Sequence, residues 1–232
     1  MHRPQRRRRT GTAMQEDNDR FWEKCAAGYD EFIWGTSALS TTYGAIRDYL
    51  CEHLDASMES LEVAAGRATL SCDLARCCKS LLATDLSEGM IKSAAEKDLP
   101  HNLELEVVDA TNLPYADASF DAVIIANALC VIPSPEMALA EARRVLRPDG
   151  MLLAPTIIWD ESMQPILQGI PTLFNYQVFA SWDAESYLEF LVEGGFAIRD
   201  SSIVSPAHVP VCLVCCTRLG PHGNDIPATA AP

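Results

Sequence analysis

The 232-residue sequence has no apolar run near the roughly 20 residues of a membrane-spanning helix, so we expect no integral membrane segment. The first ten residues are charged and lack the hydrophobic stretch of a secretory signal. Histidine is scarce, with five residues, and no group of His and Cys has the spacing of a zinc motif. These absences favour a cytoplasmic protein whose nine cysteines are free thiols.

Basic residues are also few, and the net charge is −14. Five arginines stand among the first nine residues, so the rest of the chain is more acidic still. We interpret residues 1–14 as a disordered basic extension and residues 220–232 as a disordered tail. Because phosphate contacts need Lys and Arg, the acidic body argues against nucleic acid as a partner.

Three of the cysteines, Cys212, Cys215 and Cys216, lie close together in "VPVCLVCCTRL". A C-x-x-C pair can bind metal or be redox-active, but those uses favour a turn or a helix start. This run is instead continuously β-prone, and free Cys often packs as a small buried hydrophobe. We therefore expect these thiols to be core residues.

Short apolar runs alternate with helical patterns, which predicts βαβ units and a parallel sheet. The strand candidates are 60–65, 80–85, 103–109, 120–127 and 151–158. The helix candidates are 15–35 with a break at Gly28, 41–54, 67–78, 88–97 and 135–146. Ser87 and Ser134 are placed to cap the last two, Pro135 stands in the first turn of the last, and "RPDG" at 147–150 is expected to end it. One domain over residues 15–219 is expected, with residues 15–58 as N-terminal cap helices.

The pattern changes after residue 158. Residues 159–181 are irregular and are interpreted as an insertion near an acceptor site, with Trp159, Phe174, Tyr176 and Phe179 as an apolar wall or as ordinary packing. Asp183 is expected to cap a helix over 184–193. Two further strands, 196–204 and 209–217, have no helix between them, so an antiparallel hairpin at the sheet edge is predicted.

Ligands bind at the carboxyl ends of strands in open α/β sheets, so the residues that end each strand are the candidate site. The first strand ends in Ala64-Ala65-Gly66-Arg67-Ala68, where small residues allow close backbone approach and Gly66 is expected to need special geometry. Asp85 ends the second strand at the spacing of a ribose-binding carboxylate, or simply starts a turn. Asp109-Ala110 ends the third strand and fits either an adenine edge or an ordinary turn. Asn127 follows the fourth strand as a site residue or a buried amide.

Several segments in order carry a family resemblance. They are "LEVAAGRAT", "ATDLSEGMIKSA", "VVDATNLPYADASFDAVIIANAL", "IPSPEMALAEARRVLRPDGMLL" and "SWDAESYLEFLVEGGFAI". From about residue 20 to 217 the chain resembles a class I S-adenosylmethionine-dependent methyltransferase, of the small-molecule branch that includes the ubiquinone/menaquinone C-methyltransferases. The resemblance implies a Rossmann-like three-layer α/β sandwich with a seven-stranded, mostly parallel sheet whose last strand is antiparallel.

The resemblance also implies roles for particular residues. S-adenosylmethionine would be the cofactor, S-adenosylhomocysteine the product, and a small molecule the acceptor. Glu62 and the loop from Ala64 through Gly66 to Ala68 would face the methionine portion, and Asp85 the ribose. The remaining expected contacts are Leu86, Met90, Asp109 and Ala110 around the adenine, Asn127 near the sulfonium, and Tyr29 as a cover.

Two departures from the family pattern stand out. Ala64 and Ala68 replace loop glycines, and Cys130 stands where relatives frequently have histidine, so a histidine base is not carried over and no catalytic residue is assigned. Methyl transfer by in-line displacement can rely on alignment alone. One alternative is a cofactor-binding protein without transferase activity. A nicotinamide-dependent oxidoreductase is disfavoured because "AAGRAT" lacks spaced glycines. A thiol-based arsenite methylator is disfavoured because the cysteines do not converge on strand ends.

Overall fold

The alternating runs fold into one sheet flanked by helices in the computed structural model, which describes residues 20–23, 30–31, 35–158 and 178–219. The strands are β1 (Glu59–Val63), β2 (Ser80–Asp85), β3 (Leu103–Val107), β4 (Phe120–Ile124), β5 (Leu146–Leu153), β6 (Thr156–Ile157), β7 (Phe196–Val204) and β8 (Val211–Arg218). The helices are α3 (Ser37–His53), α4 (Ser71–Leu74), α5 (Glu88–Ala95), α6 (Pro135–Val145) and α8 (Ala184–Glu193), with 3-10 turns η2 (Ala75–Cys77), η3 (Leu129–Val131) and η5 (Pro206–His208).

The sheet order is β3-β2-β1-β4-β5-β8, with β7 paired to the outer side of β8. Strands β1 to β5 are parallel, and β8 is antiparallel to both β5 and β7. The two-residue β6 also pairs with β8, so it continues β5 beyond Ala154-Pro155. The predicted mostly parallel sheet with an antiparallel last strand is therefore confirmed. The order reverses between β1 and β4, the place where such sheets bind ligands.

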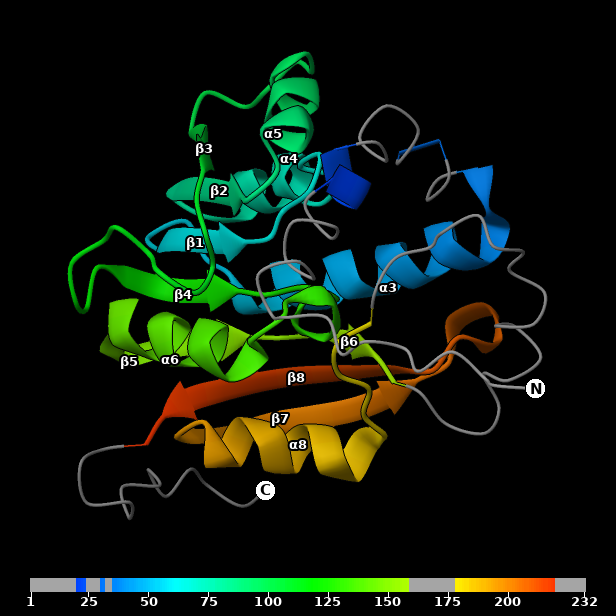
Figure 1. Cartoon of the computed structure of the whole chain (residues 1–232), viewed down its shortest axis with the longest axis vertical. Helices are drawn as coiled ribbons and strands as arrows, with labels where there is room; N and C mark the ends of the chain where they lie inside the picture. The colour runs from blue at the N-terminus through cyan, green and yellow to red at the C-terminus, as the bar shows by residue number, and fades with distance from the viewer. Residues whose placement is uncertain (1–19, 24–29, 32–34, 159–177, 220–232) are drawn as a thin grey trace, which may run out of the picture.

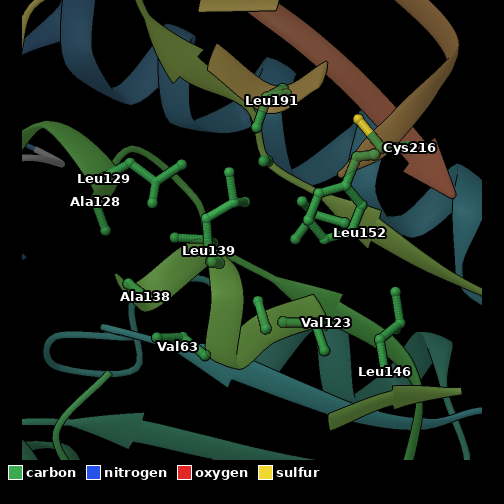
Figure 2. Packing of buried hydrophobic residues seen from close by; sticks show 14 of the residues in the cluster. Val63, Val123, Ala128, Leu129, Ala138, Leu139, Leu146, Leu152, Leu191 and Cys216 are labelled. Atoms are coloured by element: carbon green, nitrogen blue, oxygen red, sulfur yellow. The ribbon is translucent and has the colours of Figure 1, made fainter. Parts of the chain in front are cut away.

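Helices cover both faces of the sheet (Figure 1), and an apolar cluster on each face forms the core. One joins α6 and α8 to the sheet, and Figure 2 shows Leu139 of α6 in it, with Leu152 of β5 and Leu191 of α8 around it. The other joins α3 and α4 to the opposite face, with Ile46 and Leu50 of α3 fully buried. The result is the three-layer arrangement expected for this fold class.

The helix starts follow local sequence signals. The Ser87 side chain accepts a hydrogen bond from the Met90 backbone N–H at the start of α5. Asp183 and Ser186 form a reciprocal capping box at the start of α8, and Pro135 occupies the first turn of α6. The Ser134 side chain makes no capping hydrogen bond, so that part of the prediction is wrong. A proline at the first helical position needs no N–H partner there.

Several predicted elements differ from the structure. The strands predicted over 60–65, 103–109 and 120–127 end two to three residues earlier, and the one predicted over 151–158 is β5 from Leu146 to Leu153 followed by the separate β6. The helix expected over 67–78 starts only at Ser71 and tightens into η2 after Leu74, because Ala68 has φ of 54°, which is incompatible with a right-handed helix. The "RPDG" segment is not a turn outside the sheet, since residues 147–150 belong to β5. Buried Leu146 pairs with Phe120, and Arg147 forms ion pairs with carboxylates of neighbouring strands, which holds the segment along the sheet.

Several predictions concern residues outside the described part of the chain. They are the basic extension 1–14, most of the helix 15–35 including Tyr29, residues 159–177 of the insertion, and the tail 220–232. Within 15–35, residues 20–23 and 30–31 are helical. None of the described helices has the length and apolar composition that crossing a bilayer requires.

Candidate functional site

A cavity opens at the carboxyl ends of β1, β2 and β4, beside the turn that follows β3. Eight of the ten predicted cofactor-site residues line it: Ala64, Gly66, Asp85, Leu86, Met90, Asp109, Ala110 and Asn127. Of the other two, Glu62 is buried below the loop and Tyr29 lies outside the described residues. Residues scattered over more than sixty sequence positions thus meet at one place, because parallel strands end at the same edge of the sheet.

The loop after β1 bends through three residues with left-handed backbone geometry. Gly66 has φ of 58°, as its expected special geometry requires, and Ala64 and Ala68 have φ of 56° and 54°. For a residue with a Cβ this conformation costs about 1–2 kcal/mol. The two alanines therefore follow the path that glycines would take, and their strain is offset by the surrounding structure.

Asp85 holds this loop against the end of β2. Its Oδ2 accepts a hydrogen bond from the Gly66 N–H at 2.8 Å, and its Oδ1 accepts one from the Ser87 N–H at 2.9 Å. Burial raises the pKa of Asp85 above its usual range, opposed by these two hydrogen bonds. A carboxylate accepts about four hydrogen bonds, so Asp85 keeps capacity for hydroxyl donors of a ligand.

Glu62 is a buried carboxyl on β1 that supports the loop from below. The Ser71 hydroxyl donates a hydrogen bond to Glu62 Oε2, which joins β1 to the start of α4. Burial raises the pKa of Glu62 to about 7, and the Ser71 hydrogen bond acts in the opposite direction. Glu62 is 3% exposed and is separate from the residues that line the cavity.

Asp109 and Leu86 lie at the exposed edge of the cavity. Oδ1 of Asp109 accepts hydrogen bonds from the Thr111 N–H at 2.8 Å and from the Thr111 hydroxyl at 2.7 Å. These hydrogen bonds form the ordinary strand-end turn that was one of the two interpretations of Asp109. The turn holds the carboxylate at the rim of the cavity. Leu86 is 40% exposed, whereas Met90 is buried. The pair offers apolar surface on which a flat ring could lie.

Asn127 connects the cavity to two other elements. Its Oδ1 accepts from the Ile157 N–H at 3.2 Å and its Nδ2 donates to the Tyr43 hydroxyl at 3.5 Å. Its φ is 52°, a value that Asn tolerates better than most residues. Asn127 is thus an amide that satisfies a backbone N–H, and its side chain also belongs to the cavity lining.

Sequence reasoning missed part of the cavity wall, namely Trp22, Tyr43 and residues 131–134. Tyr43 follows the apolar stripe of α3, and this pattern by itself indicates only a core residue. The segment 131–134 looked like the approach to a helix. Phe179, one of the described residues 178–181 of the predicted insertion, donates its N–H to the Cys130 carbonyl, which places these described residues beside that wall.

Two carboxylates, Glu23 and Asp30, connect the described N-terminal residues 20–23 and 30–31 to elements beside the cavity. Glu23 accepts hydrogen bonds from the Ser87 hydroxyl at 2.8 Å and from the Gly89 N–H at 3.0 Å, at the start of α5. Asp30 accepts from the Thr69 hydroxyl at 2.8 Å and forms an ion pair with Lys97 at 2.7 Å. Residues 20–23, which include Trp22, are therefore attached to the start of α5, and residues 30–31 to Thr69 and Lys97.

The described cavity lining holds no side chain that is basic at neutral pH. Within the part of the chain that the structure describes, none of the lining residues is Lys, Arg or His. Burial raises the pKa of the nearby Cys130 thiol to about 11, so it stays protonated at neutral pH. Among the described residues that line the cavity, the ionisable acidic groups are the carboxyl groups of Asp85 and Asp109.

Comparisons with known proteins agree with this architecture. Residues 61–154 match a family model described as a methyltransferase domain. Demethylmenaquinone methyltransferase from Mycolicibacterium vanbaalenii is 33% identical over 144 residues, which cover 62% of this chain and 52% of that protein. The chain spans about half the length of the curated relatives it matches first.

Solved structures share the fold at lower sequence identity. The 1,6-didemethyltoxoflavin-N1-methyltransferase of Burkholderia thailandensis, with bound 1,6-didemethyltoxoflavin and S-adenosylhomocysteine, has a TM-score of 0.72 at 14% identity, with 93% of each chain covered. The [4+2]-cyclase SpnF has a TM-score of 0.63 at 21% identity, covering 75% of this chain and 80% of that one. At these identities the likeness shows the fold alone.

Residues 61–154 thus match the methyltransferase-domain class that the motifs indicated. Within that class, the relatives the chain matches in sequence include the demethylmenaquinone and ubiquinone/menaquinone C-methyltransferases, so the expected resemblance is confirmed.

Proposed function

We propose that this protein transfers a methyl group from S-adenosylmethionine to a small-molecule acceptor by in-line displacement. The observation that carries the proposal is a cavity at the switch point of the sheet whose charged lining is acidic. Such a lining suits a nucleoside cofactor that carries positive charge and no phosphate. The methyltransferase-domain match supports the same cofactor.

The residues present fit this cofactor by their chemistry. Asp85 has acceptor capacity for ribose hydroxyls, Asp109 for an exocyclic amine, and Leu86 with Met90 offers an apolar surface for a base. The left-handed loop from Ala64 to Ala68 keeps its backbone close to the cavity. The pyrophosphate of a nicotinamide cofactor would meet two carboxylates and no basic side chain among the described lining residues, which disfavours the oxidoreductase alternative.

S-adenosylmethionine, when bound, supplies an electrophilic methyl group on a sulfonium. The role we assign to the chain's own residues is positioning. Asn127 and Tyr43, hydrogen-bonded to each other at the cavity wall, fix one side, and Ile132 and Pro133 form an apolar side that favours an acceptor with an apolar face. Alignment of donor and acceptor can supply several orders of magnitude in rate without an acid or base. An acceptor that ionises by itself is therefore expected.

The test is an assay of methyl transfer from methyl-labelled S-adenosylmethionine to pools of apolar phenols and hydroquinones, read as labelled product and as S-adenosylhomocysteine. We expect transfer with at least one pool, lost or strongly reduced in Asp85→Asn. Asp98→Asn, which changes an exposed carboxylate in the same way outside the cavity lining, should keep the activity.

The second candidate is an S-adenosylmethionine-binding protein without transferase activity. The cyclase SpnF, which shares the fold, illustrates that the fold does not fix the reaction. Binding of the cofactor without formation of S-adenosylhomocysteine, with any acceptor pool, would contradict methyl transfer and favour this candidate.

A further inference from the structure

A second group of chemically reactive side chains lies away from the cavity, where the end of α3 meets the β7–β8 hairpin. It consists of His53, Asp200 and Cys215, whose potential ligand atoms all lie within 4.8 Å of one another. Cys215 is 3% exposed, whereas the side chains of His53 and Asp200 are 23% and 51% exposed. The group is therefore anchored in the core and open to solvent on one side.

An irregularity in β7 brings Asp200 into this group. Ile198 pairs with Cys216 and Asp200 with Cys215, so Arg199 is an extra residue in the ladder. Without it, strict alternation would put Arg199 opposite Cys215 and turn Asp200 to the other face. A bulge of this kind re-aims a side chain and is common near functional sites. Here it places a carboxylate beside a thiol and an imidazole.

The hydrogen bonds of His53 define which of its nitrogens is available. Nδ1 lies 2.9 Å from the Tyr49 carbonyl oxygen, which can only accept, so Nδ1 carries the proton and donates it. Nε2 lies 3.0 Å from Asp200 Oδ2, a second acceptor. A cation must therefore lie between Nε2 and the carboxylate, either a proton or a metal ion. Histidines that bind metal commonly donate the other ring N–H to a backbone carbonyl in this way.

The distances come close to those of a tetrahedral zinc centre. Zinc bonds of about 2.0–2.1 Å to nitrogen and oxygen place those two ligand atoms about 3.3 Å apart, and a thiolate at about 2.3 Å lies about 3.6 Å from each. The distance of 3.0 Å between His53 Nε2 and Asp200 Oδ2 is close to the separation of about 3.3 Å expected for these two ligand atoms. A sulfur within 4.8 Å reaches the second by a movement of roughly 1 Å.

We propose that His53, Asp200 and Cys215 form a binding site for a divalent transition-metal ion, with zinc favoured by the nitrogen, oxygen and sulfur donors. Water fills the fourth position on the exposed side. The Tyr49 hydroxyl donates to Asp200 Oδ1 at 3.0 Å and so orients this ligand from outside the coordination sphere. The ion would join the end of α3 to the two strands at the sheet edge.

This site is distinct from the cofactor cavity. Tyr43, which lines the cavity, lies ten residues before His53 on α3, about 15 Å along the helix. The metal is therefore assigned a structural role, and its loss should leave the cavity lining in place.

The test is a titration of the full reduced chain with Co²⁺, followed by displacement with Zn²⁺. We expect a saturable near-ultraviolet charge-transfer band from thiolate to cobalt, lost on addition of Zn²⁺ and absent in Cys215→Ser. Asp200→Asn, a change at a half-exposed side chain that the fold should tolerate, should lose most of the affinity. Tyr49→Phe should weaken binding roughly 10- to 100-fold, as expected for a group that orients a ligand.

The matched control is Cys216→Ser, the same change at the next thiol, which is buried on the opposite face of the sheet with the α6 and α8 cluster. It should keep the band. A band that persists in Cys215→Ser and Asp200→Asn would place the ion at other cysteines and overturn the proposal. Absence of any saturable band in the folded wild-type chain would overturn it as well.

Discussion

Replacing Ala64 with glycine should stabilise the protein, although such a change usually does the reverse. Ala64 has φ of 56°, where a Cβ costs about 1–2 kcal/mol. Glycine removes this strain but loses about 0.5–1 kcal/mol more backbone entropy on folding. The expected net gain is about 0.5–1 kcal/mol in the free energy of unfolding, or a rise in Tm of roughly 1–4 °C for a chain of this size.

Two control variants isolate the backbone effect, measured by urea and thermal unfolding. Ala118→Gly changes another residue with positive φ, 55°, in the turn before β4 and away from the cavity, and should also stabilise. Ala140→Gly, at an exposed position inside α6, should lose about 1 kcal/mol. If Ala64→Gly lost as much stability as Ala140→Gly, the left-handed geometry of the loop would be refuted.

Three further predictions concern charges and helix ends. Burial raises the pKa of Glu62 to about 7, so its ionisation lowers the stability of the folded state as pH rises from about 4.5 to 7. Glu62→Gln lacks this ionisation. Its free energy of unfolding, measured by urea unfolding at each pH, should therefore rise relative to that of the wild type across this window, by up to roughly 3 kcal/mol. A difference in the free energy of unfolding between Glu62→Gln and the wild type that does not change with pH would contradict this reasoning. Asp183→Ala removes the capping box that Asp183 forms with Ser186 at the start of α8, and it should lower the free energy of unfolding by about 1 kcal/mol in the same assay. An unchanged free energy of unfolding would show that the cap contributes nothing. Glu23→Gln should speed hydrogen exchange of the Gly89 amide, because the negative charge at the start of α5 is removed; unchanged exchange would exclude an anchoring role for Glu23.

Much of the fold could be predicted because the signals are local. Strands β2 and β7 and helix α8 have the predicted bounds, since each is an apolar run or stripe closed by clear start or stop residues. The candidate site at the strand ends also followed from the sequence. Once a parallel sheet is inferred, Asp85, Asp109 and Asn127 must converge on one edge, as the cavity lining shows.

The remaining features depend on contacts between distant segments. Tyr43 serves both the core and the cavity wall, and its periodicity alone reveals only the first. The delayed start of α4 depends on the left-handed geometry of Ala68, which a sequence of small residues does not specify. The group of His53, Asp200 and Cys215 has no motif spacing, because 147 residues separate the first two and a bulge orients the second.

The most direct test of the central claim is calorimetric titration of the wild-type chain and Asp85→Asn with S-adenosylmethionine and S-adenosylhomocysteine. We predict micromolar binding of both ligands by the wild type. The substitution should weaken it by about 1–3 kcal/mol, roughly 5- to 150-fold, through the loss of acceptor capacity for the ribose hydroxyls. Absence of binding by the folded wild-type chain, or equal binding by Asp85→Asn, would contradict the assignment of this cavity as the cofactor site.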